Sequence, residues 1–419
     1  MADYGDGRTE KVVVENLFKV FGPNPDRAFD LIEKGYDKAQ VFEETGLTIG
    51  VYDANFTVYE GEIFVVMGLS GSGKSTIVRM LNRLIEPTRG SVYVHGTDVA
   101  KLSQDELTKL RRKDMSMVFQ SFALMPHMTV LENASFGLEL AGFKRQERDK
   151  RAMEALDQVG LKPYANSFPS ELSGGMQQRV GLARGLAVDP SIILMDEAFS
   201  ALDPLIRTEM QDELLKLQEE SSRTVIFISH DLDEAMRIGD RIAMMEGGRI
   251  VQVGTPEEIL RNPADEYVRA FFRGVDPTNV LSAGDIVRDR QPTIIRHKGE
   301  GPGPRASLDR LNDQDREFGY VLDPKRKFLG VVSVDSLKEV IDKDSDKLSD
   351  AFLPEVEPVN TDASLQDILP HVTEHAWAVP VIDENGTYKG AISKNVFLRT
   401  LHRQAEEADQ AEMPQMSDA

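Results

Sequence analysis

The chain has 419 residues and a formal net charge of −21, with 41% hydrophobic residues, 28% charged residues and no cysteine. This length predicts two or three domains of a soluble, globular protein, and the lack of cysteine excludes disulfides, thiolate metal sites and cysteine nucleophiles. The acidic charge argues against nucleic acid as the main partner. The sequence shows neither an apolar run of about 18 residues nor a signal peptide, so we expect the chain to stay in the cytoplasm.

The first predicted elements are a valine-rich strand over residues 11–20 and an unusual insert over residues 23–46. Apolar residues of the insert recur at helical spacing, as Phe29, Ile32 and Tyr36 do, which predicts one or two short amphipathic helices. We interpret the insert as a docking element without chemistry of its own, because packed surface helices are common.

A phosphate-binding loop follows two predicted strands over residues 48–59 and 63–67. Residues 68–76 read GLSGSGKST and match the pattern G-x-x-x-x-G-K-[ST]. The glycines let backbone N–H groups turn inward around phosphate oxygens, and the next helix presents the positive end of its dipole. We expect Lys74 to reach the β- and γ-phosphates of a nucleotide and the Ser75 hydroxyl to bind Mg²⁺.

The region after the loop predicts strands over residues 91–95 and 115–119, the second ending at Gln120. An amide at such a strand end can lie near Mg²⁺ and the attacking water. Helical periodicity over residues 125–169 then indicates an inserted helical subdomain. The subdomain ends at residues 172–176, which read LSGGM and precede a helix whose first N–H groups are free to bind an anion.

Two further strand ends carry candidate catalytic groups. The apolar run 192–195 leads into Asp196 and Glu197, and a predicted strand over residues 224–229 leads into His230. Two adjacent acids after a strand are usually a solvated loop, but a phosphate loop upstream changes that interpretation. We expect Asp196 to hold the Mg²⁺ shell, Glu197 to polarise the attacking water, and His230 to donate a hydrogen bond to the γ-phosphate.

In this order and spacing, GLSGSGKST, Gln120, LSGGM, ILMDE, SALD and His230 resemble the ATP-binding subunit of an ABC transporter, over residues 11–274. The helical insert and the stretches MVFQSFALMPHMTV and SHDLDEAMRIGDRIAMMEGG are similar to those of the osmoregulatory glycine betaine/proline betaine importers. The resemblance implies an α/β P-loop NTPase cassette, with a mostly parallel core sheet, an antiparallel β subdomain and a helical subdomain. It also implies Mg²⁺-dependent ATP hydrolysis that energises import of a compatible solute in the osmotic stress response.

The same resemblance implies partners and a set of site residues. A second copy would bind head to tail, with its Ser173 and Gly175 on the γ-phosphate. Transmembrane permease subunits would dock after Gln120, and an extracytoplasmic substrate-binding protein would act indirectly, all at the cytoplasmic side of the inner membrane. Phe21 would stack on adenine, with Phe18 as the alternative. The residues assigned to ATP are Phe21, Gly68, Ser70, Gly71, Ser72, Gly73, Lys74, Ser75, Thr76, Ser173, Gly174, Gly175 and Asp203; those assigned to Mg²⁺ are Ser75, Gln120 and Asp196; those assigned to catalysis are Glu197, His230 and Gln120.

The C-terminal third contains an internal repeat. Residues 320–333 and 380–393 share Asp, aromatic, Gly and Ser positions, and each copy predicts strand, turn, strand and helix. An upstream helix start recurs at Ala306-Ser-Leu308 and Ala363-Ser-Leu365. The repeat is similar to a tandem pair of CBS domains over residues 279–402. Its helix starts depart from the nucleotide-binding form of that family, so adenine-nucleotide binding and a structural, dimer-bracing role both stay open.

We therefore expect a cassette over residues 1–275, with the insert at 23–46 and the helical subdomain at about 121–180. A regulatory CBS-like domain would follow at 276–403, with repeats at about 279–342 and 343–403, and an acidic disordered tail at 404–419. Two alternatives are a non-transport ABC ATPase and a nucleotide-sensing switch. The first would show two cassettes or a coiled-coil insertion, and the second a damaged catalytic end, but Glu197 and His230 are both present.

Overall fold

A computed structural model describes residues 7–409, except 121–122, 201, 274–277, 279, 290, 296–301 and 355, and omits the side chains of 220–221 and 402–409. The chain divides into two compact units, Met1–Phe272 and Arg273–Ala419. The start of the loop after Gln120, the expected start of the second domain and residues 410–419 of the expected tail lie outside the described residues.

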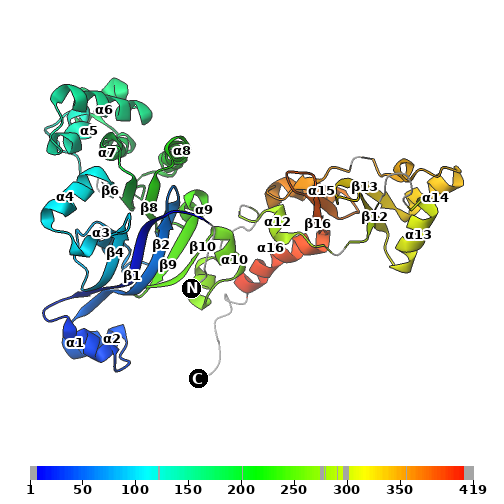
Figure 1. The fold of residues 1–419 in the computed structure, drawn as a ribbon, viewed down its shortest axis with the longest axis horizontal. Helices are drawn as coiled ribbons and strands as arrows, with labels where there is room; N and C mark the ends of the chain where they lie inside the picture. Colours follow the sequence, from blue (N-terminus) through cyan, green and yellow to red (C-terminus); the bar gives the residue numbers. More distant parts are fainter. Residues whose placement is uncertain are drawn as a thin grey trace. The chain divides into compact units, whose positions relative to one another are not determined.

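The core of the first unit is a six-stranded sheet in the order β10-β9-β3-β8-β7-β6 (Figure 1). Adjacent strands are parallel throughout the series β9, β3, β8, β7 and β6. The edge strand β10 is antiparallel to β9. Every residue of β3, β7 and β8 is buried, as expected of central parallel strands, which are apolar on both faces. The strands are β3 (Ile63–Met67), β6 (Met115–Phe119), β7 (Ile192–Asp196), β8 (Thr224–Ile228), β9 (Arg241–Glu246) and β10 (Arg249–Gly254).

An antiparallel sheet in the order β2-β1-β4-β5 packs against this core. Its strands are β1 (Glu10–Phe21), β2 (Thr48–Tyr59), β4 (Arg89–Val94) and β5 (Thr97–Asp98). Phe56 of β2 stacks on Phe64 of β3 with ring centroids 5.3 Å apart, and α3 (Lys74–Leu81) adds Ile77 and Leu81 to the same buried cluster. Each such side chain contributes about 1.5–3 kcal/mol on burial. The mostly parallel core sheet and the antiparallel β subdomain are confirmed.

The helical subdomain consists of α5 (Val130–Leu140), α6 (Arg145–Gln158) and α7 (Gly174–Ala187), which pack on one another (Figure 1). Thr129 begins α5 with a capping box, in which Glu132 accepts a hydrogen bond from the Thr129 N–H at 2.7 Å. The helix α7 ends seven residues beyond the expected boundary at 180, because Leu182 and Leu186 are buried as well. The other helices of this unit are α4 (Gln104–Lys113), α8 (Pro204–Ser221), α9 (Leu232–Ile238), α10 (Pro256–Arg261) and α11 (Glu266–Phe271).

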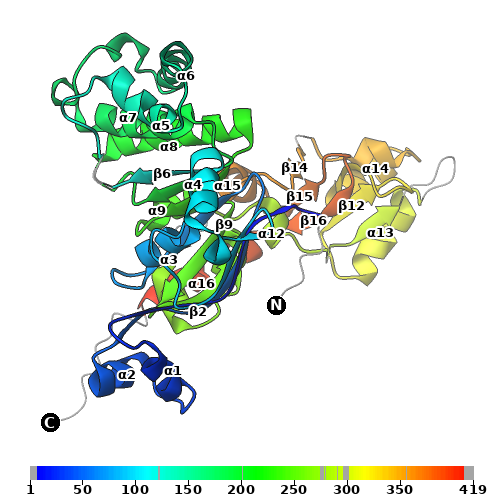
Figure 2. The ribbon, with the colours of Figure 1, turned by 60° about the vertical axis from the view of Figure 1, so that its left-hand side comes forward.

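The N-terminal insert forms two short helices, as its periodicity predicts: α1 (Asp26–Ile32) and α2 (Lys38–Thr45). Figures 1 and 2 show both helices beyond the ends of β1 and β2. They have their own apolar cluster with the two strands, in which Phe29, Val41 and Leu47 are buried. The guanidinium of Arg89 lies 3.5 Å from the centre of the Phe29 ring, and this cation–π contact connects α1 to β4.

The second unit contains two three-stranded sheets of the same construction, β11-β12-β13 and β14-β15-β16. In each sheet a parallel pair is extended by an antiparallel hairpin. The elements of the first are β11 (Thr293–Ile295), α13 (Pro304–Asp313), β12 (Phe318–Leu322), β13 (Phe328–Ser333) and α14 (Val334–Asp342); those of the second are α12 (Ala283–Ile286), β14 (Val359–Asn360), α15 (Leu365–Glu374), β15 (Val379–Ile382), β16 (Tyr388–Ile392) and α16 (Lys394–Asp409). The predicted repeat of strand, turn, strand and helix is therefore confirmed.

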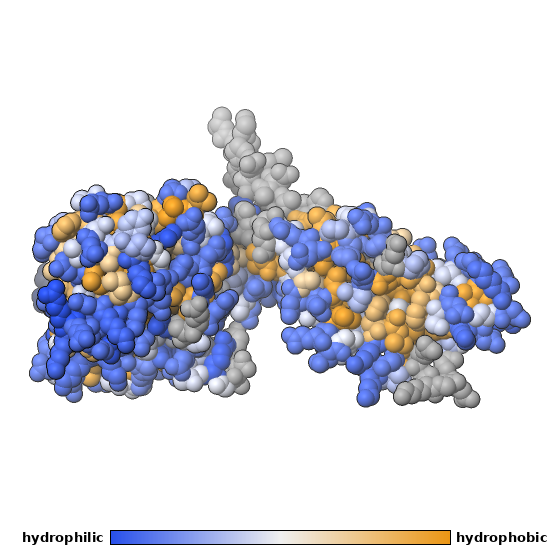
Figure 3. Space-filling model, turned by 90° about the horizontal axis from the view of Figure 1, so that it is seen from above, coloured by the Kyte–Doolittle hydropathy of each residue, from blue (hydrophilic) through white to orange (hydrophobic). Residues whose placement is uncertain are grey.

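The interior of this unit is aromatic where the two sheets meet. Tyr320 of β12 and Tyr388 of β16 are buried with ring centroids 5.6 Å apart, and Phe328 stacks on Tyr388. Apolar side chains also gather on the face of this unit seen in Figure 3. The large hydrophobic residues that the second unit exposes to solvent include Ile295, Leu329, Leu369 and Leu398.

One expected helix start in this unit was wrong. The helix α13 begins at Pro304 rather than at Ala306, because proline suits the first helical position and the Ser307 hydroxyl bonds back to the Gly303 carbonyl. Close to the expected division of the repeats at about 342 and 343, Leu348 and Ala351, in a 3₁₀ turn η5 (Leu348–Ala351), pack in the core of the first sheet.

The expected tail at 404–419 overlaps the end of a helix. The helix α16 continues to Asp409, so residues 404–409 are helical. Their sequence, QAEEAD, is rich in strong helix formers, which extend a helix despite the acidic charge.

Candidate active site

Four neighbouring parallel strands deliver the predicted site residues to one edge of the central sheet. The phosphate loop follows β3, and His230 follows β8 after one residue. Asp196 ends β7 and Glu197 follows it, while Gln120 directly follows β6. Ligand sites of open α/β sheets lie outside the carboxyl ends of the strands, where helix N-termini and loops converge. The sheet order therefore brings together residues that are up to 162 positions apart, from Gly68 to His230.

The phosphate loop requires glycine at Gly68 and Gly73. Their φ angles are 148° and 107°, and a Cβ atom would lie 2.0 Å from the Met245 carbonyl oxygen or 2.3 Å from that of Gly50. Both obstacles are backbone, so no side chain can be accommodated there. The loop closes around its own lysine: Lys74 Nζ donates to the carbonyl oxygens of Gly68 at 2.7 Å and Leu69 at 3.0 Å.

Lys74 is a largely desolvated cation. Its side chain is buried, and burial lowers the pKa of its ammonium, an effect that the carboxylates of Glu197 and Asp196 oppose. A phosphate oxygen entering the loop would supply the anion that this ammonium lacks.

The metal-binding candidates Ser75 and Asp196 are in direct contact. Ser75 Oγ donates to Asp196 Oδ1 at 2.8 Å, and Arg79 donates to Asp196 Oδ2 at 2.9 Å. A hydroxyl and a carboxylate fit Mg²⁺, which takes one or two protein oxygens and completes its shell with waters and phosphates. Sequence reasoning missed Arg79, although it lies one helical turn after Ser75 and so on the same face of α3. Within the described residues no cluster of three or more His, Cys, Asp or Glu side chains could hold a metal ion by itself.

The catalytic candidates form a connected group. Glu197 Oε2 lies 3.3 Å from His230 Nδ1, and Glu197 has a φ angle of 49°, an uncommon conformation for a non-glycine residue. Ser200 Oγ donates to the Glu197 carbonyl oxygen at 2.9 Å and accepts from Gln120 Nε2 at 3.1 Å. Gln120 is thus linked to the backbone of Glu197 through Ser200, a residue that sequence reasoning did not assign a role.

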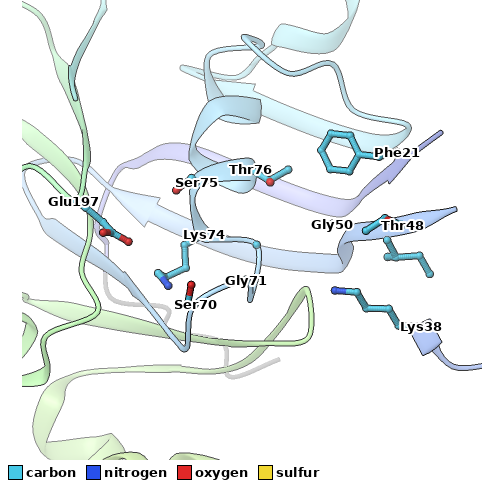
Figure 4. A pocket seen from close by; sticks show the side chains of 12 residues that line it. Phe21, Lys38, Thr48, Gly50, Ser70, Gly71, Lys74, Ser75, Thr76 and Glu197 are labelled. Atoms are coloured by element: carbon cyan, nitrogen blue, oxygen red, sulfur yellow. The ribbon is translucent and has the colours of Figure 1, made fainter. Parts of the chain in front are cut away.

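An open cavity of about 340 Å³ lies over the phosphate loop (Figure 4). This volume is in the range of small-molecule sites. Phe21 lies at one side of the cavity and Glu197 at the other, with Lys74 between them in this view. The lining residues are Phe21, Lys38, Thr48, Ile49, Gly50, Ser70, Gly71, Gly73, Lys74, Ser75, Thr76 and Glu197.

The two aromatic candidates differ in where they lie. Phe21 lines the cavity and exposes 40% of its surface. Phe18 instead packs on Phe29 and Tyr52, with ring centroids 5.3 Å away in both cases. Phe21 is therefore the aromatic ring available to a ligand in this cavity.

Several predicted residues lie outside the cavity lining. Gly68 and the buried Ser72 belong to the phosphate loop but do not line the cavity. Ser173 and Gly174 are exposed, and Ser173 caps α7 by accepting from the Met176 N–H at 3.3 Å. Asp203 caps α8 in the same way, accepting from Ile206 at 3.1 Å.

Gly175 shows that the starts of α7 and α8 lie side by side. A Cβ atom at this position would be 2.4 Å from a methyl group of Ile206. The LSGGM segment thus presents an exposed helix N-terminus, next to that of α8, outside the cavity of its own chain.

Comparison with known proteins agrees with this geometry. The family model described as "ABC transporter" matches residues 51–200, and the model described as "CBS domain" matches residues 348–403. The glycine betaine/proline betaine transport system ATP-binding proteins of Salmonella typhimurium and Escherichia coli are each 59% identical over 394 residues, which is 94% of this chain and 98% of theirs. This chain belongs to the ABC transporter ATP-binding proteins.

More distant relatives extend the similarity. The glycine betaine transport ATP-binding protein of Bacillus subtilis is 48% identical over 94% of this chain and 93% of its own length. A solved dimeric ATP-binding cassette, in a post-hydrolysis state with ADP and phosphate, is 35% identical, with a TM-score of 0.50 over 58% of this chain and 98% of that one. In this family ATP hydrolysis is coupled to transport. Among the helices described here, none is long and apolar enough to cross a membrane.

Proposed function

We propose that this chain is the ATP-hydrolysing subunit of an importer of glycine betaine or proline betaine and acts from the cytoplasmic face of the inner membrane. The observation that carries the proposal is the similarity at 59% identity to two betaine transport ATP-binding proteins over 98% of their length. The nucleotide geometry described above is intact, which supports an active ATPase rather than a sensing switch.

In the proposed site, Phe21 stacks on adenine and the loop N–H groups surround the β-phosphate, while Lys74 pairs with the β- and γ-phosphates. When bound, Mg²⁺ would be held by Ser75 and Asp196, with Gln120 nearby, and would neutralise phosphate charge. Glu197 accepts the proton of the attacking water. His230, 3.3 Å from Glu197, holds that carboxylate and donates to the γ-phosphate.

We also propose that two copies complete each other's sites. Ser173 and Gly174 are exposed and do not line their own cavity, so a γ-phosphate held by the partner subunit is the ligand that this helix N-terminus suits. Two solved cassettes that resemble this chain are dimeric. In this arrangement a monomer hydrolyses ATP slowly, and closure and reopening of the dimer drive the permease subunits.

The function is tested by reconstitution. The chain, its permease subunits and the extracytoplasmic substrate-binding protein are placed in vesicles, and uptake of labelled glycine betaine is measured with internal ATP. The expected result is ATP-dependent uptake that unlabelled proline betaine competes away. Vesicles that hydrolyse ATP but move neither betaine would contradict the proposed solute and leave the ATPase standing.

We propose a regulatory role for the C-terminal unit. The basic turn Lys325, Arg326 and Lys327 is exposed, and surface charges of this kind are screened over about 8 Å at physiological ionic strength. Docking of this unit to an anionic surface would then weaken as salt rises. The test is uptake by the reconstituted transporter, over a salt series, with the chain ending at residue 272. An unchanged salt threshold would remove the C-terminal unit from the sensing mechanism.

A further inference from the structure

The N-terminal insert contributes a cation to the nucleotide cavity. Lys38, the first residue of α2, lines the same cavity as Phe21 and Lys74. In the view of Figure 4 its side chain extends from α2 toward Gly71 of the phosphate loop, on the opposite side of Lys74 from Glu197. The insert is thus more than a packed surface element.

The position of Lys38 is fixed by the packing of α2. Asp37 accepts from the Gln40 N–H at 2.9 Å and the Gln40 side chain accepts from the Asp37 N–H, so a capping box sets the start of the helix. Further along, Val41 is buried with Leu47, which packs so closely on Gly22 that a Cβ atom there would lie 2.6 Å away. The helix therefore cannot move away from β2 without breaking this cluster.

The charge of Lys38 is available to a ligand. Lys38 forms no salt bridge with any residue that the structure describes, and Asp37, its neighbour in the chain, is engaged in the cap. An ammonium offers three donors and no acceptor, so it suits an anionic oxygen. Between the adenine end at Phe21 and the β- and γ-phosphates at Lys74, the one anionic group of ATP is the α-phosphate.

We propose that Lys38 binds the α-phosphate of ATP, which makes the insert part of the nucleotide site. The inference rests on the assignment of this cavity to ATP. Lys38 lies away from Glu197 and the γ-phosphate, so it contributes to binding and not to the hydrolytic step. ATP, ADP and AMP all carry the α-phosphate, so the affinity of the chain for each of the three should depend on Lys38.

The test is equilibrium binding to the full-length chain by calorimetry, with AMP measured by displacement of ADP. Lys38→Ala is expected to raise the Kd of ATP, ADP and AMP by one common factor of about three to ten, as for a partly exposed charge-assisted contact. Lys38→Arg should keep most of the affinity, and kcat at saturating ATP should not change. The matched control is Lys34→Ala, which removes an exposed lysine of the same insert that does not line the cavity.

Each other outcome has a defined meaning. An unchanged Kd in Lys38→Ala, or a loss equal to that of Lys34→Ala, would overturn the inference. A loss of affinity confined to ATP, or to ATP and ADP, would place Lys38 at another phosphate. A loss of affinity that disappears with 2′-deoxy-ATP would place Lys38 at the ribose. Either result would contradict the inference. A wild-type chain that binds no ATP would instead defeat the proposed function.

Discussion

Replacing Glu197 by glutamine separates ATP binding from hydrolysis. The amide keeps the size of the side chain beside His230, but it cannot take a proton from water at neutral pH. General-base catalysis contributes about 10²- to 10⁴-fold, which corresponds to about 2.7–5.4 kcal/mol in the activation free energy. The pair that Glu197 forms with His230 is partly exposed, with side-chain exposures of 23% and 56%, so the change in unfolding free energy should stay below about 1 kcal/mol.

Three measurements test this prediction. Phosphate release with the permease subunits present gives kcat, which should fall by at least about 100-fold. Calorimetry should give an ATP Kd within about threefold of wild type, because a change of that size is only about 0.65 kcal/mol, and sedimentation with ATP should show an accumulated dimer. The control Glu219→Gln, at an exposed position of α8, should leave all three unchanged. A Glu197→Gln chain that keeps more than about a tenth of the wild-type kcat would refute the general-base assignment.

Three further predictions concern the partner subunit, adenine binding and pH. A Ser173→Ala chain mixed with a Lys74→Ala chain should form heterodimers with one intact composite site and more ATPase activity than either parent; no recovery in verified heterodimers would favour a site closed within one chain. Phe21→Ala should weaken ATP binding about 2- to 13-fold, since aromatic stacking contributes about 0.5–1.5 kcal/mol. Phe18→Ala should instead lower the unfolding free energy by about 3 kcal/mol and leave Kd unchanged; the reverse pattern would make Phe18 the adenine-binding residue. Burial raises the pKa of Glu234 despite hydrogen bonds from Ser229 and Gln211, so the folded state binds the carboxyl proton more tightly than the unfolded state does. The unfolding free energy therefore falls as pH rises from about 4.5 to the pKa of the folded state. The stability of Glu234→Gln relative to wild type should therefore rise over that window and then level off; a flat difference in calorimetric unfolding would contradict the buried, proton-binding carboxyl.

The local chemistry of the site was predictable from sequence because it depends on residues that are contiguous or follow apolar strands. Glycines at positions 68 and 73 signalled a backbone that only glycine adopts. Asp196 and His230 were recognised at strand ends, and parallel strands place such ends at one edge of a sheet. The two insert helices and the repeated strand-turn-strand-helix units were found in the same way, from periodicity that local burial imposes.

Only the tertiary structure shows that Phe21, and not Phe18, lines the cavity. In a regular strand, residues three apart point to opposite faces, but β1 has register shifts between Val14 and Leu17, between Leu17 and Lys19 and between Lys19 and Val20. Each shift alters the alternation of side chains, so the face to which either ring points cannot be read from spacing.

The same limit explains the other residues that sequence reasoning missed. Lys38 enters the cavity because α2 folds back on β2 through Val41 and Leu47, and Ser200 joins Gln120 to Glu197 through hydrogen bonds between separate strand ends. The sequence by itself therefore determined the cassette, its phosphate loop and the order of its candidate catalytic residues along the chain. Which side chains meet in the cavity was decided only by packing, because contacts between distant segments depend on strand register and helix docking rather than on any local pattern.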